Sequence, residues 1–189
     1  MKRTLIVSPH TDDETFGVSG YIQRFQDTEH IHVLVVSTGN NKKNSDIRIM
    51  QCESILSKHK ITFELLNIAY SCNLAQSRAR LAAVIEEEIK TFKPNKVLIP
   101  NSNDLHQDHK LVNELCKIAS KPKRHKYIEE ILEYCVPESE EFSATFFDTE
   151  LQLTNNEHIR KVSDANIYST EYIPFLPKTE KFKTIYRRL

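Results

Sequence analysis

The sequence predicts an α/β fold of the Rossmann-like type, a three-layer sandwich built around a mostly parallel sheet. Short β-branched apolar runs alternate along the chain with longer stretches of helical periodicity, which is typical of a parallel sheet covered by helices. A length of 189 residues with 39% hydrophobic residues suits one compact domain over residues 1–189. The sequence contains no internal repeat or linker that would divide it.

The first half of the chain carries the alternation most clearly. Strands are expected at residues 4–8, 32–37, 62–66 and 96–100, and helices at residues 16–25, 46–59, 78–92 and 109–120. The helix over 78–92 has the strongest pattern, because its apolar residues form one stripe and Pro94 ends it. That stripe consists of Leu81, Val84, Ile85, Ile89 and Phe92.

Beyond Lys126 the order of elements changes. Strands are expected at residues 131–136 and 143–147, followed by a helix near 157–168 and an irregular tail. This half adds to the sheet without repeating the regular alternation.

Composition excludes several classes of protein. Only three glycines occur, and their spacing cannot form a dinucleotide-binding or P-loop motif. Equal numbers of basic and acidic residues, 26 each, argue against a protein that coats nucleic acid or an anionic membrane. The basic run 121–126 and the acidic stretch 129–141 are interpreted as solvated surface.

The same evidence bears on location. No apolar run is long enough for a signal peptide or a membrane span. The four cysteines lie far apart without a C-x-x-C pair, which favours reduced thiols over a disulfide framework. We therefore expect a cytoplasmic protein.

A first polar cluster, Ser8-Pro9-His10-Thr11-Asp12-Asp13-Glu14, directly follows the first predicted strand. Four ionisable groups within five residues are costly at the mouth of a buried strand unless something binds them. The alternative is that these residues only cap the next helix and place carboxylates in its first turn.

A second cluster, Asp104-Leu105-His106-Gln107-Asp108-His109, follows the fourth strand and precedes another helix. Its histidines are three residues apart, so one turn could direct both imidazoles into one pocket. Surface histidines near a helix start are the alternative.

The two clusters together indicate a single site, because loops at the carboxyl ends of parallel strands converge on one crevice. If the first and fourth strands are neighbours, His10, Asp13, His106 and His109 surround one point. Two imidazoles and a carboxylate with an open position form a catalytic zinc site suited to hydrolysis. Ferrous iron and other divalent metals use the same donors.

The paired motifs resemble the signatures of the LmbE-like (PIG-L) metal-dependent N-deacetylases. That family typically shows His-Pro-Asp-Asp-Glu after its first strand and His-x-Asp-His after a later one. Here the matching residues are His10-Thr11-Asp12-Asp13-Glu14 and His106-Gln107-Asp108-His109, within a resemblance that runs from about Thr4 to Leu111. Members include deacetylases of phosphatidylinositol-linked N-acetylglucosamine and of mycothiol and bacillithiol synthesis.

The resemblance implies roles for the residues of both motifs. The metal ligands fall on His10, Asp13 and His109, and the general base falls on Asp12. His106 is expected to stabilise the oxyanion, kept cationic by Asp108.

Residues outside those roles have weaker matches to the family. Glu14 is interpreted as a residue that holds a ligand or loop in place, and Arg48 resembles an arginine that reaches the substrate. Thr11 replaces the usual proline, and Gln51 stands where a glutamate is common. A loose match at Lys161, Tyr168, Thr170 and Glu171 receives no catalytic role.

The resulting prediction is a hydrolase that cleaves the acetamide C–N bond of an N-acetylglucosamine-type sugar or sugar conjugate. Its expected partner is that small molecule, with no nucleic acid, and the oligomeric state stays open. The first alternative is a catalytically weak metal- or sugar-binding protein of the same fold. A ferrous oxygenase is disfavoured by the β/α alternation, and a nucleic-acid module would rest on residues 121–126 alone.

Overall fold

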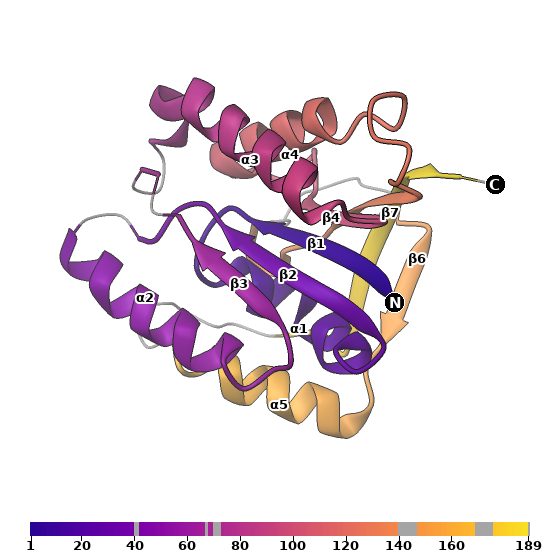
Figure 1. Cartoon of the computed structure of the whole chain (residues 1–189). Helices are drawn as coiled ribbons and strands as arrows, with labels where there is room; N and C mark the ends of the chain where they lie inside the picture. The colour runs from indigo at the N-terminus through magenta and orange to yellow at the C-terminus, as the bar shows by residue number, and fades with distance from the viewer. Residues whose placement is uncertain (40–41, 67, 70–72, 140–146, 169–175, 189) are drawn as a thin grey trace.

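One seven-stranded sheet forms the middle layer of the protein (Figure 1). The computed structural model describes residues 1–39, 42–66, 68–69, 73–139, 147–168 and 176–188. The strands lie in the order β3-β2-β1-β4-β5-β7-β6. Their bounds are β1 Lys2–Ser8, β2 Glu29–Val35, β3 Thr62–Leu65, β4 Lys96–Pro100, β5 Glu130–Tyr134, β6 Thr149–Gln152 and β7 Thr179–Arg187.

Strands β3, β2, β1, β4 and β5 are mutually parallel, whereas β7 is antiparallel to both β5 and β6. The chain builds outward from β1 to β2 and β3 on one side, then crosses back to β4 on the other. The order of the parallel strands therefore reverses between β1 and β4. In open α/β sheets, ligands bind beyond the carboxyl ends of the strands at such a reversal.

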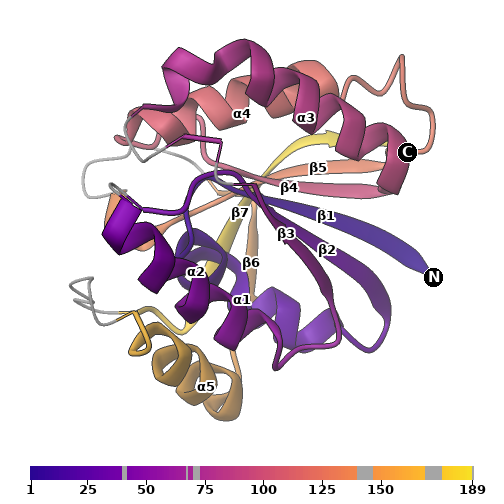
Figure 2. The ribbon, with the colours of Figure 1, turned by 60° about the vertical axis from the view of Figure 1, so that its left-hand side comes forward.

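Helices cover both faces of the sheet (Figures 1 and 2). Helices α1, α2 and α5 lie on one face, and α3 and α4 lie on the other. Their bounds are α1 Asp13–Phe25, α2 Lys42–Leu56, α3 Arg78–Phe92, α4 Gln107–Ala119 and α5 Asn155–Ala165, with short 3-10 turns η1 Leu74–Ser77 and η2 Pro137–Ser139.

Each central strand contributes side chains to two hydrophobic cores, because successive side chains point to opposite faces of the sheet. In β1, Ile6 joins the core under α1, α2 and α5, while Leu5 and Val7 join the core under α3 and α4. All three side chains are fully buried. Continuous apolar runs such as Leu5-Ile6-Val7 are therefore what a strand covered on both faces requires.

The predicted fold class is confirmed, and so is the pairing of the first and fourth strands. Helix 78–92 is observed with the predicted bounds, and the other predicted helices are present with ends shifted by a few residues.

For the second half of the chain, one prediction is wrong and another concerns residues that are almost all outside the described ranges. The predicted irregular tail is wrong, because residues 179–187 form β7 inside the sheet. The strand predicted at 143–147 falls almost wholly outside the described residues, and the strand observed nearby is β6, which begins at Thr149.

None of the described helices combines the length and the apolar character needed to cross a membrane. Among the described cysteines, Cys52 and Cys116 are free thiols.

Candidate metal centre and active site

Three donor atoms meet beyond the carboxyl ends of β1 and β4. His10 lies in the loop after β1, Asp13 begins α1, and His109 lies in the first turn of α4. His10 Nδ1 is 3.3 Å from Asp13 Oδ2, His109 Nε2 is 3.2 Å from the same oxygen, and the two ring nitrogens are 3.3 Å apart. The three atoms thus form a nearly equilateral triangle.

The size of this triangle fits a tetrahedral metal ion. Ligands at the zinc–nitrogen distance of about 2.0–2.1 Å stand about 3.3–3.4 Å apart at the corners of a tetrahedron. His10, Asp13 and His109 are 8%, 3% and 2% exposed, so the donors are not the surface histidines of the alternative interpretation. The donor set and its spacing suit a divalent metal with one open position.

A buried carboxylate lies behind each of these histidines. Asp108 Oδ2 is 3.1 Å from His10 Nε2, and Asp104 Oδ2 is 2.8 Å from His109 Nδ1. Ser139 donates to Asp104 Oδ2 at 2.5 Å, which fixes that carboxylate in turn. Metal-binding histidines usually carry such a partner on the second nitrogen, because it sets the tautomer and the ring orientation.

The charges of the centre are strongly coupled. Burial disfavours the ionised form of Asp13, but His109 and His10 outweigh burial and hold the pKa of Asp13 well below its usual range. Burial also disfavours protonated His10, but hydrogen bonds with Asp108 and Asp13 raise its pKa to about 9. The pKa of His109 is raised to about 10 against burial by Asp13 and Asp104. The carboxylates therefore attract positive charge to this point.

Asp12 lies beside the donor triangle and is held by Arg48. It is the N-cap residue of α1, yet its side chain makes no capping hydrogen bond. Its Oδ2 accepts a 2.8 Å bond from Arg48 Nη1 of helix α2. A capping role therefore does not explain why an aspartate stands at position 12. Arg48, which was predicted to reach the substrate, contacts Asp12, the predicted general base. Gln51 is directed elsewhere and donates to the backbone oxygen of Ile167.

His106 is the N-cap residue of α4, and its Nδ1 accepts a hydrogen bond from the Asp108 backbone N–H at 3.2 Å. The expected pairing of the Asp108 carboxylate with His106 needs correction, because that carboxylate lies against His10. Burial, together with His10 and His109, lowers the pKa of His106, so the predicted cationic state is not favoured either. An Nδ1 that accepts a hydrogen bond leaves the ring hydrogen on Nε2.

Glu14 is fully buried behind the centre. It accepts hydrogen bonds from Tyr168 at 2.8 Å and Ser8 at 3.2 Å, and burial raises its pKa to about 7. Ser8 also donates to the backbone oxygen of His10 at 2.7 Å. Through Ser8, Glu14 therefore contacts the loop that carries His10.

The two described residues of the loose family match near the C-terminus, Lys161 and Tyr168, contact different partners. Tyr168 reaches Glu14, whereas the fully buried Lys161 pairs with Glu180 at 2.7 Å. Thr170 and Glu171 lie outside the described residues.

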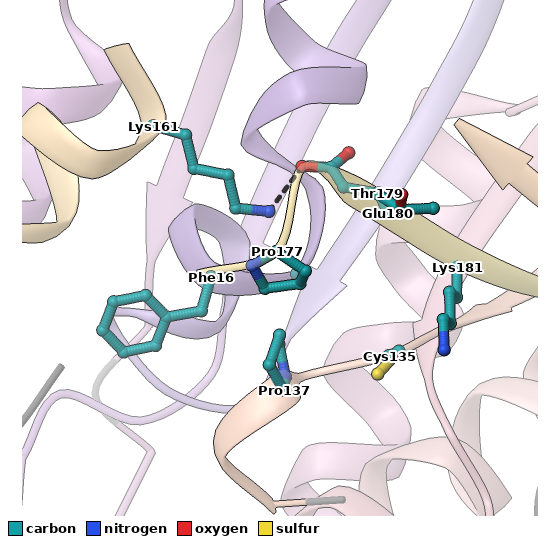
Figure 3. Close-up of a pocket in the computed structure, with 9 residues that line it drawn as sticks. Phe16, Cys135, Pro137, Lys161, Pro177, Thr179, Glu180 and Lys181 are labelled. Atoms are coloured by element: carbon teal, nitrogen blue, oxygen red, sulfur yellow. Dashed lines mark hydrogen bonds and ion pairs between the residues drawn. The ribbon is translucent and has the colours of Figure 1, made fainter. Parts of the chain in front are cut away.

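A cavity of about 200 Å³ lies between α1, α5 and β7 (Figure 3). The ion pair of Lys161 and Glu180 closes one side of it, and Phe16, Pro137 and Pro177 line another. None of His10, Asp13 and His109 is among the described residues that line this cavity. It is therefore a feature separate from the metal centre.

Asp104 and Ser139 are residues of the centre to which the sequence interpretation assigned no role. Asp104 is fully buried, and its Oδ1 also accepts a hydrogen bond from the His106 backbone N–H at 2.8 Å. An aspartate two residues before one predicted site histidine and five before another was the available signal. Ser139 follows β5 and carries no local signal.

Comparisons with known proteins identify a matching family. A family model described as PIG-L: GlcNAc-PI de-N-acetylase matches residues 5–120. A search of curated protein sequences finds no match.

Solved structures share the fold at low sequence identity. A deacetylase triple mutant of the teicoplanin biosynthetic pathway has a TM-score of 0.79 at 14% identity and covers 99% of each chain. The N,N'-diacetylchitobiose deacetylase from Pyrococcus horikoshii, solved with its inhibitor, has a TM-score of 0.76 at 16% identity, covering 98% of this chain and 84% of that one.

The fold is also found with a different reaction. GalB, the 4-carboxy-2-hydroxymuconate hydratase from Pseudomonas putida KT2440, has a TM-score of 0.66 at 18% identity and covers 100% of this chain and 98% of its own. At such identities these neighbours show the fold alone. The family model, however, spans more than half of the 189 residues and includes both motifs, and the chain therefore belongs to the PIG-L family.

Proposed function

We propose that this protein is a metal-dependent N-deacetylase that removes the acetyl group from an N-acetylglucosamine-type sugar or sugar conjugate. The observation that carries the proposal is the triangle of His10 Nδ1, Asp13 Oδ2 and His109 Nε2, with Asp12 and His106 at its edge. Membership of the PIG-L family supports the reaction class, and the deacetylases among the structural neighbours agree with it.

His10, Asp13 and His109 would hold the metal, and zinc fits their donor set, with ferrous iron as the other candidate. When bound, such an ion supplies a Lewis acid that lowers the pKa of water to about 7 and polarises a carbonyl. The carboxylates of Asp108 and Asp104 keep both imidazoles oriented with the ligating nitrogen inward.

Asp12 is proposed as the general base. It is adjacent to Asp13, and one of its oxygens lies within 4.8 Å of the donor atoms of His10 and Asp13. It takes a proton from the attacking water and later delivers one to the departing amine nitrogen as the amide C–N bond breaks. The Arg48 guanidinium, at 2.8 Å, orients Asp12 and stands where it can also bind a polar group of the sugar.

His106 is proposed to stabilise the oxyanion as a neutral hydrogen-bond donor. Its Nδ1 is occupied by the Asp108 backbone N–H, so Nε2 carries the hydrogen that can point to the negative oxygen. One such donor contributes about 3 kcal/mol to the stability of the transition state. A preset neutral donor needs no change in protonation during the reaction.

The alternative is a metal- or sugar-binding protein of the same fold with weak catalysis. Asp12 and His106, which binding alone does not require, favour the enzyme. Because GalB shares the fold, addition of water to a carbon–carbon double bond is the competing reaction to test.

The test is a paired product assay on the zinc-loaded protein. We expect N-acetylglucosamine or N,N'-diacetylchitobiose to yield acetate and free amine in equal amounts. Asp12→Asn should slow this release about 10²- to 10⁴-fold, whereas the exposed surface variant Asp27→Asn should keep it. Hydration of an unsaturated dicarboxylate without any acetate release would contradict the proposal.

A further inference from the structure

A second group of metal-binding side chains lies away from the centre described above. His32 of β2, Glu64 of β3 and Glu88 of α3 each offer one donor atom, and these atoms all lie within 4.8 Å of one another. His32 Nε2 is 3.6 Å from Glu88 Oε1. His32 stands three residues before the end of β2, about 10 Å along the strand from the edge where the first centre lies.

The histidine ring is fixed with one nitrogen facing the carboxylates. His32 Nδ1 is 2.8 Å from Thr62 Oγ1, whose hydroxyl donates to the Ile31 backbone oxygen at 3.5 Å. We assign the ring hydrogen of His32 to Nδ1, because the Thr62 hydroxyl is directed to the Ile31 oxygen, and this assignment leaves the lone pair on Nε2. That Nε2 is buried and has no hydrogen-bond partner among the described residues.

The described surroundings of His32 favour a neutral ring. Burial and the neighbouring His30 lower the pKa of His32 to about 4, so the ring is neutral at pH 7. Burial, together with the negative charges of Glu64 and Glu87, raises the pKa of Glu88. Within the described ranges, neither Glu64 nor Glu88 forms an ion pair with a lysine or arginine.

A buried lone pair and two carboxylates that face each other repel unless a cation lies between them. One imidazole nitrogen and two carboxylate oxygens are a suitable donor set for a first-row divalent ion. We propose that His32, Glu64 and Glu88 form a second divalent-metal site that binds Zn²⁺ independently of the first centre.

The position of the site gives it a structural role. β3 is one of the two edge strands of the sheet, and α3 packs on the face that carries His32. A metal ion held by these three residues would join β2, β3 and α3. The proposal does not depend on the deacetylase function, because none of these residues belongs to that centre.

Calorimetric titration of the metal-stripped protein with zinc chloride tests the proposal. We expect two equivalents in the wild type, one in Glu88→Gln, one in Asp13→Ala and none in the double variant. Glu87→Gln, at the neighbouring exposed position of α3, should keep two equivalents. Failure of the first centre would remove the Asp13-dependent equivalent only, so the two claims fail separately.

A second variant and a second measurement guard against misfolding. Glu64 is exposed, so Glu64→Gln should fold normally and should also lose one equivalent. In the Asp13→Ala background, zinc should raise the melting temperature, and Glu64→Gln or Glu88→Gln should abolish that rise. Retention of the Asp13-independent equivalent in both variants, or its absence from Asp13→Ala, would overturn the proposal.

Discussion

The paired carboxylates behind His10 and His109 separate this centre from a chance cluster of histidines. Each histidine directs one nitrogen to the donor triangle and the other to a buried aspartate. A helix start rich in polar residues needs neither arrangement. These two histidine–aspartate pairs are therefore the strongest argument that the site binds a metal ion.

Asp104 provides a direct test of that argument. Asp104→Asn removes the negative charge behind His109 while keeping the size of the side chain, so we expect metal affinity to fall about 10- to 100-fold. Competition with a chromophoric chelator measures this change. Asp27→Asn, on the surface beside Lys60, is the control, and equal affinities in the two variants would contradict the role of Asp104.

Asp12 and Asp13 are adjacent but have different proposed roles: Asp12 is the general base, and Asp13 is a metal ligand. Asp12→Asn should retain the metal and lose turnover about 10²- to 10⁴-fold, the range of a general base. Metal analysis and acetate release on the same sample separate the two effects. Loss of metal from Asp12→Asn would show that Asp12 is a ligand instead.

The sequence could predict that His10, Asp13 and His109 lie close together, because both motifs are local and follow strands. It did not predict which aspartate faces which histidine, because that depends on how α4 meets the loop after β1. The Asp108 carboxylate, assigned to its near neighbour His106, instead crosses 98 positions of sequence to reach His10. The contact of Ser139 with Asp104 could not be predicted for the same reason, because it also joins segments that are far apart in the sequence.

At the scale of elements, α1 is packed unusually close to its neighbours. A Cβ atom at Gly17 would lie 2.7 Å from the ring of Tyr134, which is fully buried and donates to the Val7 backbone oxygen. The glycine therefore lets the helix that begins at Asp13 sit against β5.

Gly17→Ala decides between two opposed effects. Helix propensity alone favours alanine by about 1 kcal/mol, whereas overpacking against an immobile ring costs about 1–3 kcal/mol. We expect overpacking to dominate and the free energy of unfolding in urea to fall. Ser19→Ala in the same helix should cause no loss, since the buried Ser19 hydroxyl has no partner among the described residues. A stabilised Gly17→Ala variant would contradict the close packing.

The success of element prediction followed the strength of local patterning. Helix 78–92 was predictable because its stripe and its end at Pro94 are both encoded nearby. Strand β7 was missed because Lys181 and Lys183 interrupt its apolar residues, and only pairing with β5 and β6 makes it a strand.

At the scale of the whole molecule, a buried ion pair joins the C-terminal elements to α1. Glu180 of β7 accepts from Lys161 of α5 at 2.7 Å and from the backbone N–H groups of Gly20 and Tyr21. Lys161 and Glu180 are each 1% exposed at the side chain (Figure 3). One carboxylate thus holds three elements together.

Removing one member of this pair leaves a buried charge without its counterpart. Glu180→Gln or Lys161→Met should each lower the free energy of unfolding by about 3–5 kcal/mol. The double variant carries no buried charge and should lose less than the sum of the two. Denaturant unfolding of all four proteins measures the coupling, and strictly additive losses would contradict it.

The overall architecture was predictable because β/α alternation leaves few ways to build a sheet. The neighbouring positions of β1 and β4, which bring the two motifs together, follow from that architecture. The C-terminal half breaks the alternation, so its place in the sheet and the Lys161–Glu180 pair could not be foreseen.

Metal analysis of the wild type beside Asp13→Ala tests the central claim most directly. Both proteins are loaded with zinc, freed of excess metal and measured by mass spectrometry, with Asp12→Asn as the control. The account predicts one equivalent fewer in Asp13→Ala than in the wild type and no loss in Asp12→Asn. Equal metal content in the wild type and Asp13→Ala would show that the two motifs do not form a metal centre.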